Sequence, residues 1–155
     1  MNVAQLLVRA GRVFGERLAL AVGTEPRGTY SDLALRVAIL ATAQRSRFAL
    51  APGDRVALLM KNCDEYVEVL FAGWHAGLTM VPVNAKLHPR EFHYILKHSQ
   101  SRLSFVTAVL AETVASLKPD LLALETVVCF NGADYAALFA GDAVPPAART
   151  PDHIA

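Results

Sequence analysis

The stretch Leu70-Phe-Ala-Gly-Trp-His-Ala-Gly-Leu-Thr-Met-Val-Pro-Val-Asn-Ala-Lys-Leu87 indicates how the chain folds. Trp74 closes an apolar helical stripe, and Gly77 can take the left-handed backbone conformation that ends a helix. The apolar run from Leu78 to Val83 then has the length of a short buried strand. The stretch therefore predicts a helix, a turn and a strand in succession, and no group in it is an obvious catalyst.

Upstream of this stretch the sequence predicts two helices, a hairpin and a buried strand. Thr29 and Asp32 match a capping box, and Asn62 should cap the helix that leads into the opening stretch, with Glu65 as its partner. The elements expected are a helix over residues 3–15, a strand over 18–22, a turn over 23–28 that leads back into extended residues 29–30, a helix from there to about residue 45, and a strand over 55–60.

Downstream, helices and strands alternate. Pro89 suits the first turn of a helix and Glu91 suits a capping position. The elements expected are helices over 89–98, 110–117 and around 135–139, and strands over 103–106 and 126–130. Strands that are continuously apolar and alternate with helices favour an α/β fold: a mostly parallel sheet with helices on both faces, plus the N-terminal hairpin as its one antiparallel element. Residues 1–140 should form this α/β subdomain, and the Ala- and Pro-rich residues 141–155 should form a linker.

Composition excludes several classes of function. A chain of 155 residues fits one domain, and 54% hydrophobic against 19% charged residues indicates a sheet buried on both faces or a missing partner. A formal net charge of +1 without a basic run gives no long-range field for nucleic acid or an anionic membrane.

The uncharged stretch from Val69 to Ala85 is short of the ~20 residues of a membrane span, and no signal peptide is visible. Two cysteines suit a reducing cytoplasm.

Most of the familiar catalytic patterns are missing. No strand is followed by a glycine-rich phosphate turn, no Gly-x-Ser-x-Gly elbow occurs, and the histidines are not spaced as metal ligands. The acids Asp64, Glu65 and Glu68 occupy the first turns of a predicted helix, so we expect them to serve its N-terminal dipole rather than acid–base chemistry. The same acids should raise the pKa of Cys63, which argues against a nucleophile.

Lys86 is the best candidate for a functional charge, with Asn84 and His88 beside it. All three follow the predicted strand that ends at Val83. Open parallel sheets bind their ligands at the carboxyl ends of strands, so these side chains are candidates for a substrate or phosphate contact. No catalytic, cofactor-binding or metal-binding residue is predicted within this chain.

Four segments together resemble a known family. They are Thr29-Tyr-Ser-Asp-Leu33, Gly53-Asp-Arg-Val56, Asn62-Cys-Asp-Glu-Tyr66 and Val83-Asn-Ala-Lys-Leu87. In this order they resemble the N-terminal portion of AMP-forming acyl-CoA synthetases of the adenylate-forming superfamily, and the last is similar to fatty-acyl and aryl-CoA ligases in particular. Pro151-Asp-His-Ile-Ala155 resembles the approach to the family's phosphate loop.

The resemblance implies an activity for a longer protein. The family joins a carboxylic acid, here expected to be a fatty acid, to ATP with its magnesium ion, and then transfers the acyl group to coenzyme A. The family's catalytic segments have no counterpart in these 155 residues, so we expect the chain by itself to need no cofactor and to be inactive. Apolar surface left uncovered should favour a homo-oligomer.

Two other hypotheses about the function of the chain stay open. The chain could be a small stand-alone module that binds a nucleotide or flavin at the strand ends around Asn84 and Asn131. It could instead be a non-catalytic interaction protein derived from a synthetase, with a partner on its exposed apolar face.

Overall fold

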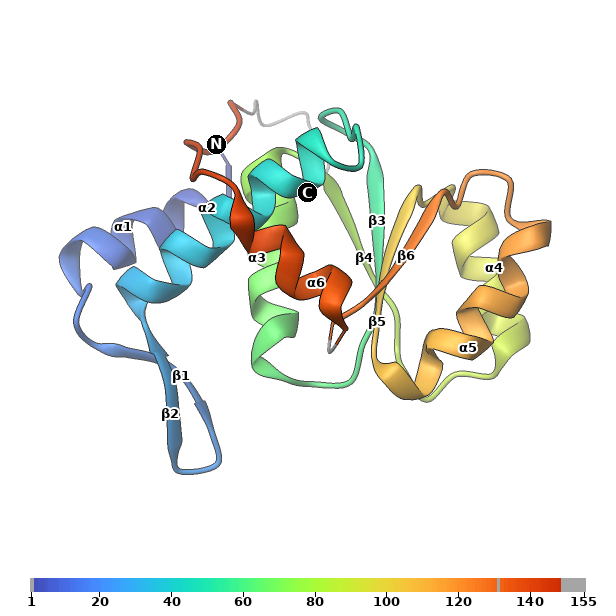
Figure 1. The fold of residues 1–155 in the computed structure, drawn as a ribbon, viewed down its shortest axis with the longest axis horizontal. Coiled ribbons are helices and arrows are strands. Elements are labelled where there is room, and N and C mark those ends of the chain that lie inside the picture. Colours follow the sequence, from blue (N-terminus) through green and yellow to red (C-terminus); the bar gives the residue numbers. More distant parts are fainter. Residues whose placement is uncertain (1, 131, 149–155) are drawn as a thin grey trace.

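The computed structural model describes residues 2–130 and 132–148. A four-stranded parallel sheet has helices on both sides, and an antiparallel hairpin stands apart from it (Figure 1). The elements are α1 (Gln5–Val13), β1 (Leu18–Val22), β2 (Glu25–Thr29), α2 (Tyr30–Ser46), β3 (Arg55–Leu59), α3 (Asp64–Ala76), β4 (Thr79–Pro82), α4 (Pro89–Ser99), β5 (Leu103–Val106), α5 (Ala108–Leu117), β6 (Thr126–Cys129) and α6 (Ala133–Ala137). Short 3-10 turns follow α5 and α6, at Lys118–Asp120 and Leu138–Ala140.

The strands of the main sheet lie in the order β4-β3-β5-β6, and all neighbours are parallel. Val56 of β3 pairs with Met80 of β4 on one side and with Leu103 of β5 on the other. A helix lies between each successive pair of strands, as parallel pairing requires. Pro82, which has no N–H to donate, lies on the edge strand β4, where a strand is paired on one side only.

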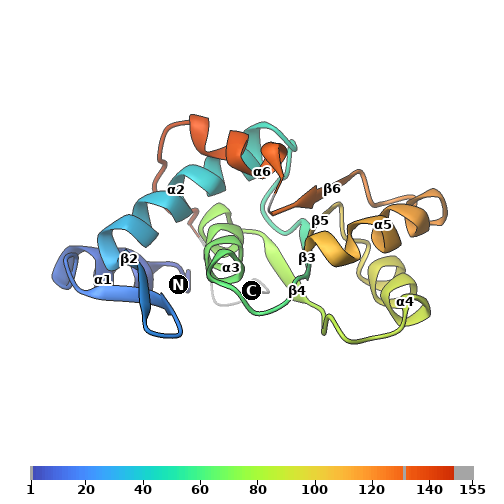
Figure 2. The ribbon, with the colours of Figure 1, turned by 60° about the horizontal axis from the view of Figure 1, so that its bottom comes forward.

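The alternation of side chains along β3 explains why the sheet is covered on both faces. Val56 and Leu58 belong to an apolar core shared with α2 and α3, whereas Ala57 and Leu59 belong to a second core shared with α4 and α5. Figure 2 shows these two helical layers on opposite sides of the strands. The predicted α/β architecture with a parallel sheet and an N-terminal hairpin is therefore confirmed.

The hairpin is longer than the sequence predicted. Residues 23–28 were expected to form a turn, but β2 already begins at Glu25, and Pro26 lies opposite Ala21 of β1. The reversal is confined to Gly23 and Thr24, with Gly23 at φ 61°. The prediction was wrong because a proline was read as a turn signal, although each strand of a two-stranded ribbon has an outer edge where a missing N–H costs little.

Two helix boundaries follow the predicted signals. The Thr29 hydroxyl accepts from the Asp32 N–H at 3.2 Å, and the Asp32 carboxylate accepts from the Thr29 N–H at 3.0 Å, so the capping box of α2 is confirmed. Gly77 ends α3 in the left-handed region at φ 80°.

The predicted cap of α3 is wrong. The residue that precedes this helix is Cys63, without a side-chain cap bond, and Asn62 lies one residue too early. Asp64 and Glu65 supply the negative charge of the first turn in place of a cap. Asn62 is thereby left in the loop that follows β3, where it lines a cleft described below.

Residues 141–148 have no regular secondary structure, yet they are held against α2 and α3. The Thr42 hydroxyl donates to the Asp142 carbonyl at 2.6 Å, and the His75 Nε2 lies 2.6 Å from the Val144 carbonyl. The predicted boundary at residue 140 remains a prediction, and residues 151–155, where the approach to a phosphate loop was expected, lie outside the described residues. No helix in the described part of the chain combines the length and apolar character that a bilayer span requires.

Candidate functional site

A cleft opens where β3 and β4 end, at the carboxyl edge of the sheet. Its volume is about 610 Å³. The lining residues come from the segment after β3, from the first turn of α3, and from the last residue of β4 and the segment after it: Met60, Lys61, Asn62, Tyr66, Pro82, Val83, Asn84, Ala85 and Lys86. Because the two strands are adjacent and parallel, the segments that follow them meet at one place.

Hydrogen bonds from backbone N–H groups to side-chain oxygens fix both segments that line the cleft. After β3, the Lys61 N–H donates to the Thr107 hydroxyl at 2.7 Å, which ties this segment to the end of β5. After β4, the Asn84 side-chain oxygen accepts from the Lys86 N–H at 3.0 Å, a local turn that asparagine is well suited to form. The two lysines are thus carried by ordered segments rather than by long loops.

The structure brings together two of the three predicted site residues. Lys86 and Asn84 line the cleft, but His88 does not. The His88 Nδ1 accepts from the Arg90 N–H at 3.2 Å and the Glu91 carboxylate accepts from the His88 N–H at 2.9 Å, so His88 caps α4. The predicted helix start at Pro89 with Glu91 as capping acid is confirmed, whereas a ligand contact by His88 is left without structural support.

Lys61 and Tyr66 were not predicted as site residues from the sequence, and Asn62 was expected to cap a helix. A usable signal existed for Lys61, because it follows one apolar strand as Lys86 follows the next. That signal becomes meaningful only when β3 and β4 are known to be neighbours in the sheet.

The chemistry of the cleft suits an anion. Lys61 and Lys86 line it together with Asn62 and Asn84, and neither lysine forms an ion pair within the described residues. Burial raises the pKa of the Tyr66 phenol, which therefore stays protonated and can donate a hydrogen bond. The arrangement can hold a carboxylate or a phosphate, but it offers no nucleophile paired with a base.

Cys63 lies next to the cleft and is not activated. Burial, with smaller contributions from Glu65 and Asp64, raises the pKa of its thiol to about 11. The predicted direction of the shift is confirmed, although burial is its larger cause.

Glu68 has a structural role that differs from the predicted one. It was expected to serve the helix dipole, but its side chain is buried and accepts a bidentate contact from Arg36 of α2, with 2.9 Å between Arg36 Nη2 and Glu68 Oε2. The Tyr135 hydroxyl donates to the same oxygen at 3.0 Å. Glu68 therefore joins α2, α3 and α6, and this was invisible in the sequence because its partners are 32 and 67 residues away.

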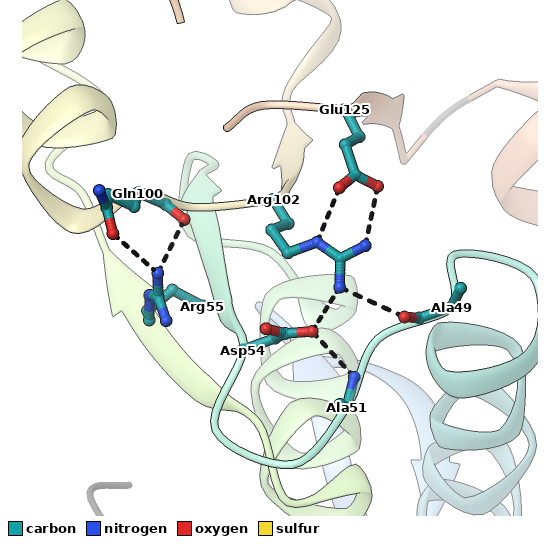
Figure 3. Close-up of polar contacts among 7 residues, drawn as sticks. All are labelled: Ala49, Ala51, Asp54, Arg55, Gln100, Arg102 and Glu125. Atoms are coloured by element: carbon teal, nitrogen blue, oxygen red, sulfur yellow. Dashed lines mark hydrogen bonds and ion pairs between the residues drawn. The ribbon is translucent and has the colours of Figure 1, made fainter. Parts of the chain in front are cut away.

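The opposite, amino edge of the sheet carries a closed ion network (Figure 3). Arg102 donates to both oxygens of Glu125, at 2.8 and 3.0 Å, and also to the Asp54 carboxylate and the Ala49 carbonyl. The hydrogen bonds to Glu125 and Asp54 raise the pKa of Arg102. Four hydrogen bonds to protein atoms engage all three nitrogens of this guanidinium, so Arg102 is committed to the fold.

No group of three or more His, Cys, Asp or Glu side chains gathers as a metal site among the residues that the structure describes. Asn131, the second residue suggested for a nucleotide or flavin module, lies outside that part of the chain.

Comparison with known proteins connects this fold to one enzyme family. A family model described as AMP-binding enzyme matches residues 7–155. The chain is 43% identical over 89 residues to a feruloyl-CoA synthase of Amycolatopsis sp, covering 57% of this chain and 18% of that protein. It is 32% identical over 123 residues to 4-hydroxybutyrate–CoA ligase 2 of Metallosphaera sedula, covering 77% of this chain and 22% of that protein.

Among solved structures, the chain is similar to the N-terminal domain of FACL13 from Mycobacterium tuberculosis. The TM-score is 0.84 at 27% sequence identity, and the match covers 99% of this chain and 40% of that one. The chain thus spans about a fifth of the length of the curated relatives named above.

Proposed function

This chain belongs to the AMP-binding enzyme family, and we propose that it is the N-terminal portion of an ATP-dependent carboxylic acid–CoA ligase. The observation that carries the proposal is the likeness in fold to the FACL13 domain over 99% of the chain. The relatives named above support it, because one is named for an aromatic acid and the other for a short hydroxy acid. Because these acids differ so much, the proposed substrate is a carboxylic acid without the restriction to a fatty acid that was expected from the sequence.

The proposed reaction has two steps in the longer enzyme. A carboxylate oxygen of the acid attacks the α-phosphorus of ATP, and pyrophosphate leaves. The sulfur of coenzyme A then attacks the acyl carbonyl carbon, and AMP leaves as the thioester forms. The lysine-lined cleft fits an anionic part of these substrates and not a cation, so the magnesium ion would enter with the phosphates of ATP.

Within this scheme, Lys61 and Lys86 hold an anionic substrate group at the carboxyl edge of the sheet. An ammonium group attracts carboxylate or phosphate as a point charge, and the two lysines reach the cleft from neighbouring strands. Tyr66 donates from the first turn of α3. These groups bind and orient, because none of them is paired with a base that could move a proton.

We propose that the 155-residue chain by itself does not ligate. Stabilising the phosphoryl transfer needs several donors aimed at the transferring group, and the cleft supplies only two cations. Acid-dependent pyrophosphate release by the purified chain, above a mock preparation, would overturn this part of the proposal.

The reducing cytoplasm is our proposed compartment, in keeping with Cys63 and Cys129, which are both free thiols.

The test of the site uses the longer enzyme that contains this chain. Lys61→Ala and Lys86→Ala should each raise the KM of the anionic substrate that they touch by about tenfold with little change in kcat, because they remove binding common to ground and transition states. His88→Gln is the matched control: it changes a neighbouring residue that does not line the cleft, and it should leave both constants unchanged.

The outcomes separate the site from the function. Unchanged KM and kcat in both lysine variants would remove the cleft as a substrate site while leaving the ligase activity intact. Absence of acid-dependent AMP formation in the unmodified longer enzyme, tested with aromatic, short and long acids, would overturn the proposed function itself.

A further inference from the structure

The N-terminal end of the molecule concentrates exposed apolar side chains. Among the described residues, ten large apolar side chains are exposed, and seven of them lie within the first 35 residues: Val3, Leu6, Val13, Phe14, Leu18, Val22 and Leu35. Figures 1 and 2 show α1 and the hairpin together at one end of the molecule, away from the parallel sheet. This end is unlike the rest of the surface, where the other three are Tyr94, Val109 and Leu122.

Helix α1 presents an apolar face to solvent as well as one to the protein. Its inner face is buried through Leu7 and packs closely on α2, since a Cβ built on Gly11 would lie 3.0 Å from the Ala34 Cβ. On the outer face Leu6 is 62% exposed and Val13 is 61% exposed. These two residues are seven positions apart, which is about two turns, so they form one outward stripe.

Arginines flank this stripe. Arg9 and Arg12 are both exposed on α1, and the helix contains no acidic residue. Beyond the helix, the Arg17 guanidinium lies over the Phe14 ring at 5.1 Å from its centroid. Arg27 on the hairpin is also exposed, but it lines a hollow with Asp32, Asp64 and Glu65. The basic character therefore rests on Arg9, Arg12 and Arg17, which only Glu16 opposes between residues 2 and 22. The N-terminal end of the molecule is therefore basic and apolar, although the net charge of the whole chain is small.

We propose that α1 and the hairpin form a docking surface for an anionic lipid bilayer. A short helix that carries apolar and basic residues together lies in the headgroup region, with its apolar side chains at the acyl boundary. Arginine side chains lay their aliphatic stems along that boundary while their guanidinium groups stay with the lipid phosphates. Leu6 and Val13 supply the apolar contact, and Arg9 and Arg12 supply the attraction.

Charge and shape favour this occupant over a second copy of the chain. A symmetric dimer through the same face would bring Arg9 and Arg12 toward the arginines of the other copy, and like charges repel. The apolar side chains are also spread over the outside of a helix and a hairpin, which a fluid surface can follow. The docking surface is separate from the lysine cleft and independent of the proposed ligase activity.

The test measures binding of the 155-residue chain to vesicles by co-sedimentation. Vesicles of phosphatidylcholine with ~30% phosphatidylserine should bind the chain, pure phosphatidylcholine should bind it much more weakly, and raising the salt from about 50 to 500 mM should release it, because the attraction is screened. The double variant Arg9→Gln, Arg12→Gln should weaken binding about fivefold for each arginine removed. The double variant Leu6→Ser, Val13→Ser should weaken binding to anionic vesicles at both salt concentrations.

Matched controls lie at the other end of the molecule. Leu122→Ser removes a side chain that is 98% exposed, and Arg90→Gln removes an exposed arginine on α4, so both should bind vesicles like the unmodified chain. Thermal unfolding of every variant checks that the fold is kept. If the apolar variant does not fold, the arginine variant decides the question alone, because its side chains are exposed.

Equal binding to anionic and neutral vesicles would overturn the proposal, as would arginine variants that bind like the controls. Light scattering gives the remaining outcome. Suppose that the chain does not bind vesicles, that it forms a dimer, and that the Leu6→Ser, Val13→Ser variant is monomeric. This face would then join two copies of the chain, and the proposal would also be overturned.

Discussion

The two edges of the parallel sheet differ in whether their cationic side chains form ion pairs. At the amino edge Arg102, which precedes β5, is bound by Asp54 before β3 and by Glu125 before β6. At the carboxyl edge, Lys61 after β3 and Lys86 after β4 lie at a cleft without an acidic partner among the described residues. The sheet thus carries an ion network before β3, β5 and β6 at one edge and, at the other, two lysines after β3 and β4 without an ion-pair partner in the described part of the chain, and β3 contributes to both.

This contrast teaches where to look for function in such a sheet. Arg102 uses its guanidinium on carboxylates and a backbone carbonyl, so it stabilises the fold and is not free to bind a ligand. Lysines at a cleft without an ion-pair partner contribute little to the stability of the fold, so their charge is available to a ligand. Substitutions at the two edges should therefore change different measurable quantities.

The largest effect on stability is expected at the amino edge. Arg102→Met should lower the free energy of unfolding by about 1–2 kcal/mol, because it leaves two carboxylates beside each other without their cation. Urea denaturation at pH 7 measures the change. Arg90→Met is the matched control, since Arg90 is exposed and its side chain forms no ion pair in the described residues. Equal losses in the two variants would contradict a special role for the amino edge.

A smaller effect is expected from acid. Hydrogen bonds from Arg102 lower the pKa of Glu125 in the folded protein. A carboxyl group whose pKa is lowered on folding stabilises the protein above its unfolded pKa of about 4.3, and this contribution is lost as the pH falls through the folded pKa. The stability difference between the unmodified chain and Arg102→Met should therefore shrink as the pH is lowered from 5 toward 3. Denaturation midpoints across that range measure it, and a constant difference would argue against the linkage.

The smallest effect on stability is expected at the carboxyl edge. Lys61→Ala and Lys86→Ala should each change the free energy of unfolding by less than about 0.5 kcal/mol, as exposed residues without partners usually do. The same denaturation series measures both. A loss above about 1 kcal/mol would mean that the lysine is structural, and the two edges would then not differ as described.

Much of this fold could be predicted from the sequence, because the signals that set its helix boundaries are local. The capping box at Thr29, the left-handed Gly77 and the helix start at Pro89 each depend on residues within a few positions, and all three were predicted correctly. Errors arose where one residue type has two uses. Pro26 was read as a turn although it lies in β2, and Asn62 was read as a cap although it lines the cleft.

The sequence by itself determined the alternating strands and helices, the family and two residues of the candidate site, Asn84 and Lys86. These follow from periodicity and from motifs whose parts lie close together in the chain. Only the tertiary structure decided that Lys61 joins Lys86, that Glu68 is bound by Arg36 and Tyr135, and that Arg102 closes the amino edge. Such contacts join residues tens of positions apart, and they depend on which strands and helices become neighbours, which the spacing of residues along the chain does not record.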